Sequence, residues 1–190
     1  RDLLSISDPR AQRIYRPVQD GLVQVEERLR RLAVTDVADL AGPLDYVLRS
    51  TGKRLRPAIT LLASRLGHGG QEPSIVMATA VELLHLATLI HDDTVDNATL
   101  RRGHSTVNHR WGRNVAILLG DYIFAMSATL VCDTHNIRVI RRFAETIMEL
   151  SSGQLQEYCQ AFNWRQSRKD YEERIFRKTA SLFQTAAESG

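Results

Sequence analysis

Apolar residues recur every three or four positions along most of the chain, the spacing that gathers them on one face of an α-helix. The first series consists of Ile14, Val18, Leu22, Val25, Leu29 and Leu32. It follows Ser7-Asp8-Pro9, where capping residues precede a proline in the first turn. The pattern predicts a first helix that ends near Ala33. A second helix is predicted over 37–49, and Gly42-Pro43 could break or restart it.

The remaining apolar series predict further helices joined by polar connections. Their expected ranges are 57–66, 75–93, 114–132, 137–162 and 169–188. A loop at 51–54, a glycine-rich turn at 67–73 and a polar, basic loop up to Arg113 separate the first of them. No segment alternates as a strand does, and there is no internal repeat. We therefore expect an all-α fold, an antiparallel helical bundle, in a single domain over residues 1–190.

Composition narrows the function classes. Apolar residues make up 43% and charged residues 25%, as in ordinary globular proteins. A net charge of +3, without a run of five or six basic residues, argues against a nucleic-acid partner. The 25 basic residues are 22 Arg and only three Lys, at Lys53, Lys169 and Lys178. Each position that keeps Lys is therefore a candidate for a specific role.

The cysteines and the most apolar segment bear on location. Cys132 and Cys159 are too few for a disulfide framework and are expected to be reduced core thiols in a reducing cytosol. Residues 1–5 lack the apolar core of a signal peptide. The stretch 115–131 contains Asp121 and falls short of the usual length of a membrane span. We expect it to be a buried helix, and the protein to be cytoplasmic without a membrane span.

Three aspartates near the end of a predicted apolar helix are the most informative group. Asp92 and Asp96 are four residues apart, so their carboxylates project from one helix face and can share a hard cation. Each negative charge there opposes the helix dipole by roughly 0.3–1 kcal/mol. With Asp93 beside them, these acids indicate a magnesium-type site, the alternative being a solvated acidic helix end. His85 falls on the same face about 10 Å along the axis, where a lone histidine is commonly a satisfied core residue.

Two basic clusters complement the acids. Gly52-Lys53-Arg54-Leu55-Arg56-Pro57 places three cations just before a helix N-terminus, which suits phosphate. Arg101-Arg102-Gly103 follows the aspartates, and arginine forks match phosphate oxygens in pairs. Either cluster alone is more often surface charge. Together with the acids, they indicate a diphosphate ligand.

This ordered set of motifs resembles the trans-polyprenyl diphosphate synthase family. The matching motifs are Gly-Lys-Arg-Leu-Arg-Pro (52–57), Glu-Leu-Leu-His (82–85), Asp-Asp-Thr-Val-Asp (92–96), Leu-Arg-Arg-Gly (100–103), Gly-Asp-Tyr (120–122) and Ile-Phe-Arg-Lys-Thr-Ala (175–180). The likeness covers nearly the whole chain from about residue 40. It implies an isoprenoid synthase-type bundle around a deep apolar pocket, acting as a prenyltransferase. The expected reaction joins isopentenyl diphosphate to an allylic prenyl diphosphate with Mg²⁺, in a homodimer.

The resemblance also implies roles for individual residues. Isopentenyl diphosphate would bind Lys53, Arg56, His85 and Arg102. Mg²⁺ on the allylic diphosphate would be held by Asp92 and Asp96, with Asp93 in support. The departing allylic diphosphate would be held by Arg101, Lys178 and Thr179. Family members carry a second aspartate-rich motif further on, which is not found in residues 1–190, so this chain resembles an N-terminal portion.

The residues one turn before Asp92 bear on product length. By resemblance, Thr88 and Ala87 form the floor of the pocket that receives the growing tail, which would then pass Leu84, Val81 and Met77. Because Thr88 and Ala87 are small, a product longer than fifteen carbons is expected.

Three other functions fit parts of the sequence. A ferritin-like di-iron protein would use Glu82-Leu83-Leu84-His85, but it needs a second such motif, and none occurs in these 190 residues. A class I terpene cyclase shares the aspartate chemistry but acts on one substrate, whereas two basic clusters favour two diphosphates. A non-catalytic or incomplete subunit of a heteromeric prenyl diphosphate synthase is the third alternative.

Overall fold

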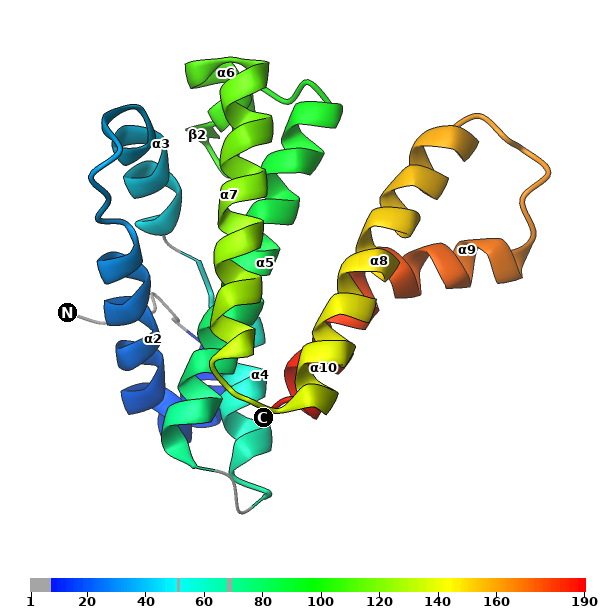
Figure 1. The fold of residues 1–190 in the computed structure, drawn as a ribbon. Coiled ribbons are helices and arrows are strands. Elements are labelled where there is room, and N and C mark those ends of the chain that lie inside the picture. Colours follow the sequence, from blue (N-terminus) through cyan, green and yellow to red (C-terminus); the bar gives the residue numbers. More distant parts are fainter. Residues whose placement is uncertain (1–7, 51, 68–69) are drawn as a thin grey trace.

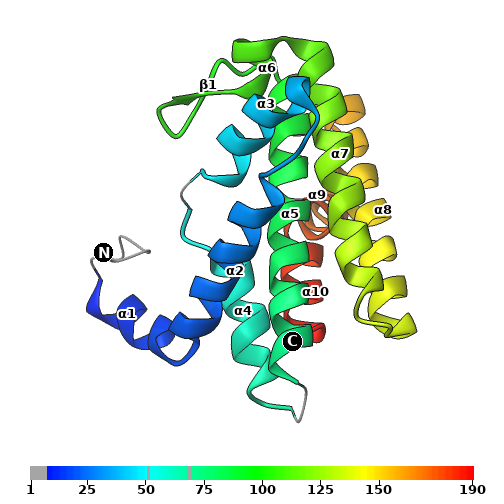
Figure 2. The same ribbon diagram turned by 60° about the vertical axis from the view of Figure 1, so that its left-hand side comes forward.

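The all-α fold predicted from the sequence is confirmed in the computed structural model, which describes residues 8–50, 52–67 and 70–190. The expectations that concerned residues 1–5, Ser7, Thr51 and the His68-Gly69 part of the glycine-rich turn lie outside the described residues. The long helix α5 (Gln71–Val95) runs through the middle, with α2, α4, α7 and α10 around it (Figures 1 and 2).

The first predicted helix is present but interrupted. Its parts are α1 (Pro9–Tyr15), the 3₁₀ turn η1 (Arg16–Val18) and α2 (Gln19–Leu32). The Asp8 side chain accepts a hydrogen bond from the backbone N–H of Arg10 and caps α1. The interruption coincides with Pro17, which lacks the N–H that an unbroken helix would use.

The next two helices show how proline position matters. Helix α3 (Ala38–Leu48) continues through Pro43, which is buried, so the possible break at Gly42-Pro43 does not occur. The sequence predicts that the next helix begins at Pro57. Helix α4 (Leu55–Ser64) begins two residues earlier. Pro57 is therefore the third residue of α4, and its missing N–H costs nothing because first-turn N–H groups have no partner within the helix.

Helix α5 is buried on nearly all sides, as expected for a helix that is apolar around its whole circumference. One side contributes Leu83, Leu86, Ala87 and Ile90 to a core shared with α2, α3, α4 and α7. The other side contributes Met77, Ala80, Val81 and Leu84 to a second core, shared with α8 and α10. The C-terminal turns of α5 extend beyond the second core.

The polar loop after α5 contains structure that the sequence analysis did not predict. Strands β1 (Leu100–Arg101) and β2 (His104–Ser105) pair antiparallel around a two-residue turn. Arg102 and Gly103 have φ of 51° and 82°, as a type I′ turn requires. The expectation of no strands was wrong here, because two-residue strands are too short to show alternation. Helix α6 (Val107–Trp111) follows, and the Thr106 side chain caps it.

Helix α7 (Arg113–Cys132) is only partly buried, so the expectation of a buried helix over 115–131 was wrong. Ala116, Leu119 and Ile123 lie in the core, whereas Leu118 is 67% exposed. By length and composition alone, both α5 and α7 are apolar enough to cross a membrane, a test that buried core helices also pass. Most of α5 is buried within the fold, but only a third of the most apolar part of α7 is.

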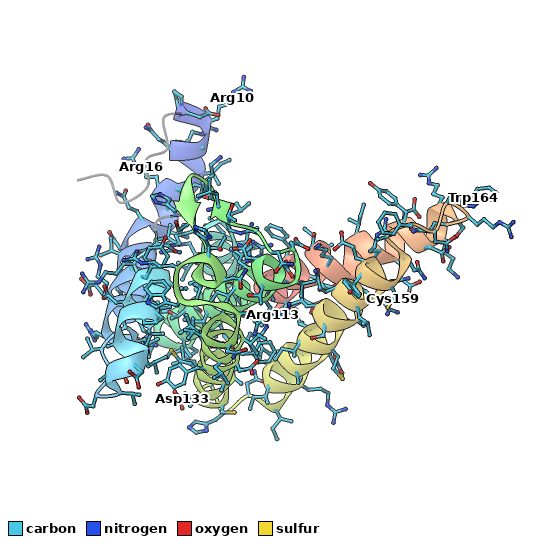
Figure 3. The ribbon with its side chains drawn as sticks, turned by 90° about the horizontal axis from the view of Figure 1, so that it is seen from above. Arg10, Arg16, Arg113, Asp133, Cys159 and Trp164 are labelled. Atoms are coloured by element: carbon cyan, nitrogen blue, oxygen red, sulfur yellow. The ribbon has the colours of Figure 1, made fainter. Side chains whose placement is uncertain are left out.

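The C-terminal elements form an arm that diverges from α7 (Figure 1). They are α8 (Ile137–Gln160), α9 (Arg168–Ile175), the π-helical turn η2 (Phe176–Ala180) and α10 (Ser181–Glu188). The helix predicted over 169–188 is thus a continuous run with a π turn in its middle. Helix α10 packs against α4, α5 and α8, while Trp164 marks the outer end of the arm (Figure 3).

Both cysteines are free and exposed, so the expectation of core thiols was wrong. Cys132 is the last residue of α7, and Cys159 lies on the outer part of α8 (Figure 3). Val131, beside Cys132, is buried in the core, whereas Leu155, Tyr158 and Phe162, around Cys159, are exposed. Neither cysteine forms a disulfide.

Candidate functional site

Two cavities lie on opposite sides of the C-terminal half of α5. The first has a volume of about 610 Å³ and lies between α3, α5, the β1–β2 hairpin and the loop before α4. Because Arg54, His85, Arg101 and Arg102 line it, we call it the basic cavity. The second has a volume of about 520 Å³ and lies between α5, α7, α8 and η2. Asp92 and Lys178 line it, and we call it the aspartate cavity.

Arg54 is held within the fold and is not available for a ligand. Its side chain is 3% exposed and donates to Glu82 over 2.7 Å and to the backbone oxygen of Ser50 over 2.8 Å. It also forms an ion pair with Glu26 of α2. Of the three cations expected to bind phosphate at the N-terminus of α4, Arg54 is therefore not available. Arg54 instead ties the loop to α2 and α5.

Lys53 and Arg56, on either side of this buried arginine, remain candidates. Lys53 is exposed, and its backbone oxygen accepts a hydrogen bond from the Tyr15 hydroxyl over 2.9 Å. The guanidinium of Arg56 lies over the ring of Phe183, 4.3 Å from its centre. The Nε of Arg56 is buried without a hydrogen-bond partner in the described part of the chain. A buried donor of this kind is suited to an anion.

His85 faces a concentration of positive charge. Burial, followed by the repulsion of the nearby Arg56, Arg102 and Arg101, lowers the pKa of His85 to about 3. The imidazole is therefore neutral at neutral pH, because protonation would add a charge to an already cationic site. Burial, followed by the repulsion of Arg102, also lowers the pKa of Arg56. The arrangement favours a bound polyanion.

Asp93 is separated from the other two aspartates. It is 6% exposed and lines the basic cavity, where Arg101 Nε donates to both of its oxygens over 2.9 Å. This hydrogen bond raises the pKa of Arg101. The structure therefore brings Arg101 to Asp93, and Asp92 to the opposite cavity.

Asp92 and Asp96 are the available carboxylates of the cluster. Asp92 is half-buried in the aspartate cavity, and Asp96 is the exposed residue that ends α5. In the described residues, no side chain donates a hydrogen bond to either carboxylate. Burial raises the pKa of Asp92; Lys178 opposes this and Asp96 adds to it. A cation near both groups would relieve the repulsion between them.

The donor set fits a divalent cation held jointly with a ligand. Among the described residues, no group of three or more His, Cys, Asp and Glu side chains could hold a metal ion alone. Asp92 in the last turn of α5 and Asp96, the C-cap residue that follows the helix, supply two carboxylates. Mg²⁺ is commonly bound through one or two carboxylates together with substrate phosphates. These two residues would hold it there.

Lys178 and Thr179 come from the π turn η2. Lys178 lines the aspartate cavity and forms an ion pair with Glu157 of α8, whereas Thr179 is exposed. A Cβ on Gly153 of α8 would lie 2.9 Å from the Cβ of Arg177 and 3.0 Å from the backbone nitrogen of Lys178. Because Gly153 has no side chain, η2 can approach α8 closely. This close approach determines where Lys178 lies in the aspartate cavity.

The three residues expected to receive the prenyl tail are not together. Thr88 lines the aspartate cavity, and its hydroxyl donates to the backbone oxygen of His85 over 2.7 Å. Ala87 and Leu84 are completely buried, in the first and the second core respectively. The apolar lining beside Thr88 comes instead from Phe124 and Leu150. Sequence reasoning missed these two because they belong to distant helices.

Residues 37–190 match a family model described as polyprenyl synthetase. Heptaprenyl diphosphate synthase component 2 of Geobacillus stearothermophilus is 36% identical over 177 residues, covering 93% of this chain and 55% of that protein. Octaprenyl diphosphate synthase of Haemophilus influenzae is 33% identical over 191 residues, covering all of this chain and 56% of that one. The chain thus spans about half the length of these relatives.

Solved structures show the same arrangement of helices. A decaprenyl diphosphate synthase from Rhodobacter capsulatus has a TM-score of 0.88 and 34% identity, covering 94% of this chain and 55% of that chain. A polyprenyl synthase from Caulobacter crescentus, complexed with calcium and isoprenyl diphosphate, has a TM-score of 0.89 and 31% identity at the same coverage. These neighbours are isoprenoid synthases with an all-α fold.

Proposed function

The chain belongs to the polyprenyl synthetase family, and we propose that it elongates prenyl chains, joining isopentenyl diphosphate to an allylic prenyl diphosphate. One observation supports this above the others. Arg101, Arg102 and His85 line a cavity on one side of α5, and Asp92 lines a cavity on the other side. Two diphosphates can therefore bind close together without sharing the same groups.

We assign isopentenyl diphosphate to the basic cavity and the allylic diphosphate to the aspartate cavity. Arg102 in the cavity lining would bind phosphate oxygens, and neutral His85 would donate one hydrogen bond. Lys53, between the lining residues Gly52 and Arg54, and Arg56, close to Arg102, would add contacts from beside the cavity. On the other side, Lys178 and Thr179 would meet the allylic diphosphate. Arg101 lines the basic cavity, where Asp93 holds it, and would have to leave Asp93 to reach the allylic diphosphate.

The reaction follows from these positions. The allylic C–O bond breaks, and the leaving diphosphate keeps the electron pair beside Lys178. Mg²⁺ bound by Asp92 and Asp96 would supply further neutralisation of that charge. The double bond of isopentenyl diphosphate attacks the allylic cation, and a C–C bond forms. Loss of a proton, with the departing diphosphate as base, gives a chain five carbons longer. Apolar side chains such as Phe124 and Leu150 limit the access of water to the cation.

Labelled isopentenyl diphosphate tests this function directly. We expect the chain to form labelled prenyl diphosphates only when an allylic primer and Mg²⁺ are both present. A cyclised product from the allylic diphosphate alone would instead support the terpene cyclase. Product formed only after a second protein is added would support the heteromeric subunit, a form suggested by the component 2 relative. Tightly bound iron would point to the di-iron alternative.

We propose that the product is longer than fifteen carbons. The small Thr88 side chain leaves the cavity open, and relatives named for seven to ten isoprene units favour a long product. Thr88→Phe should shorten the main product by at least one isoprene unit, because the ring would occupy the cavity. Thr88→Ser, which keeps the hydroxyl and a smaller side chain, should not shorten it. Chromatography of the products decides, and a wild-type product of only fifteen carbons would contradict the proposal.

The exposed face of α7 supports a homodimer. Ile117, Leu118 and Tyr122 are all exposed and lie on neighbouring turns. Covering these side chains with a second copy of the chain would remove apolar surface from water. We place this dimer in the cytoplasm.

A further inference from the structure

Gly120 and Asp121 of α7 form part of a sequence motif to which the proposed reaction assigns no role. Both lie against His91, the residue immediately before Asp92 on α5. His91 also lines the aspartate cavity. The contact is thus adjacent to the carboxylate proposed to hold the cation.

Gly120 is required by space and not by backbone conformation. It lies inside α7 and does not have a positive φ. A Cβ at this position would overlap Nε2 of the His91 ring and would lie 2.5 Å from Cδ2 and 3.0 Å from Cε1. Real Cβ atoms essentially never make such contacts. The imidazole therefore lies directly against the backbone of α7.

The partners of the ring determine which nitrogen carries the proton. Nε2 is 3.2 Å from the backbone oxygen of Ile117 and 3.4 Å from Oδ1 of Asp121. Both oxygens are acceptors, so Nε2 must be protonated and donate to the Ile117 oxygen. The Asp121 carboxylate favours the same tautomer. Shape and hydrogen bonding thus hold the ring in one orientation.

This orientation matters because Asp92 has no comparable support. It lies in the last turns of α5, where helices fray, and no side chain in the described part of the chain donates to its carboxylate. On the other side, Asp93 is held by Arg101. His91 supplies the matching contact on the α7 side. Fixing the ring fixes the rotation of the helix end and so directs Asp92 into the aspartate cavity.

We propose that His91 is a positioning residue, held by Gly120 and Asp121, which sets the direction of Asp92 and thereby the cation affinity of the site. The proposal rests on the proposed function for the identity of the cation ligand. The contact between α5 and α7 itself does not depend on that function.

The first test adds one methyl group. Gly120→Ala should displace the ring and raise the Mg²⁺ concentration for half-maximal elongation on the order of tenfold, a typical effect of losing a ligand's supporting contact. The KM for isopentenyl diphosphate should stay unchanged, because the basic cavity lies on the other side of α5. Gly42→Ala is the matched control, since a Cβ there meets nothing within 4 Å. It should leave both constants unchanged.

The second test separates hydrogen bonding from bulk. His91→Gln places an amide N–H near the position of Nε2 and should retain most of the cation affinity. His91→Asn places its amide near Nδ1 and should not. In a His91→Ala background, Gly120→Ala should lower the cation affinity little further, because the ring that the added methyl group would displace is absent. An equal loss of cation affinity in all of these variants would mean that His91 has a merely structural role, and would overturn the proposal.

Two readouts do not require turnover. Nitrogen-15 spectra of the wild-type chain should show His91 as the Nε2–H tautomer, and Gly120→Ala should abolish this. Mn²⁺ binding in the presence of inorganic diphosphate, followed by electron paramagnetic resonance, should weaken in Gly120→Ala and not in Gly42→Ala. If the wild-type chain makes no product, the proposed function fails, and these readouts still test the positioning. Unchanged spectra and unchanged Mn²⁺ binding would overturn it.

Discussion

Arg54 and Arg56 are two residues apart, and burial gives them different roles. Arg54 is surrounded by oxygen acceptors from Glu26, Glu82 and Ser50, so its charge is compensated within the fold. In the described part of the chain, the buried Nε of Arg56 has no hydrogen-bond partner, and burial lowers the pKa of this residue. The first stabilises the loop, and the second is available to an anion.

Replacing Arg54 tests its structural role. Arg54→Met leaves the buried Glu82 and the partly buried Glu26 without their shared partner, and should lower the free energy of unfolding by about 3–5 kcal/mol. Arg168→Ala is the matched control. It removes an arginine from an ion pair that is largely exposed, and should change stability little. Urea denaturation of the two variants measures the difference. Similar losses for both would show that burial of the Arg54 network contributes nothing special.

His85 gives the stability a defined pH dependence. Its pKa is about 3 in the folded chain and near 6.5 when unfolded, so between these values the unfolded chain binds more protons. Stability should therefore fall as pH drops from about 6.5 toward 3, by up to about 1.4 kcal/mol per pH unit from this group. His85→Gln should flatten the profile over that window. Equal slopes in wild type and variant, from urea denaturation at several pH values, would contradict this.

Among the elements, α5 and η2 organise the site. Helix α5 carries His85 and Asp93 toward one cavity and Thr88 and Asp92 toward the other. The π turn η2 brings Lys178 to the second cavity, and π turns occur often at functional sites. The position of η2 depends on the close approach of α8 at Gly153.

Gly153 tests the importance of that approach. Gly153→Ala places a Cβ against the backbone nitrogen of Lys178, which cannot move away without shifting η2. We expect a loss of about 1–3 kcal/mol in stability, as for overpacking in a core. Elongation should fall as well, because Lys178 moves. Gly42→Ala controls for the change of residue type. A Gly153→Ala chain as stable and active as the Gly42→Ala chain would show that the contact is unimportant.

At the scale of the whole molecule, one face of α7 exposes Ile117, Leu118 and Tyr122. Part of that face is apolar, while the opposite face fills the first core. Leu118→Arg should convert the proposed homodimer to a monomer, because a buried, unpaired charge opposes association. Leu66→Arg, at an exposed position after α4, should remain dimeric. Sedimentation equilibrium separates these outcomes. A wild-type chain that is monomeric at micromolar concentration would contradict the proposed dimer.

Much of this protein was readable from the sequence, because the relevant signals are local. Helical periodicity and capping residues determined the all-α class and most helix limits, and the ordered motifs determined the family. The failures were also physical. The β1–β2 strands are too short to alternate, and the exposure of Cys132 and of one face of α7 depends on which helices pack beside them.

The tertiary structure decided how the predicted site residues are distributed. Three loop cations look alike in sequence, but only packing against α2 and α5 shows that Arg54 is already neutralised by Glu26 and Glu82. Three aspartates form one motif, but the helix turns Asp93 to Arg101 and Asp92 to Lys178. The roles of His91, Gly120 and Phe124 could be inferred only from the packing of α5 against α7. Motifs depend on neighbours along the chain, whereas cavities depend on contacts between helices far apart in it.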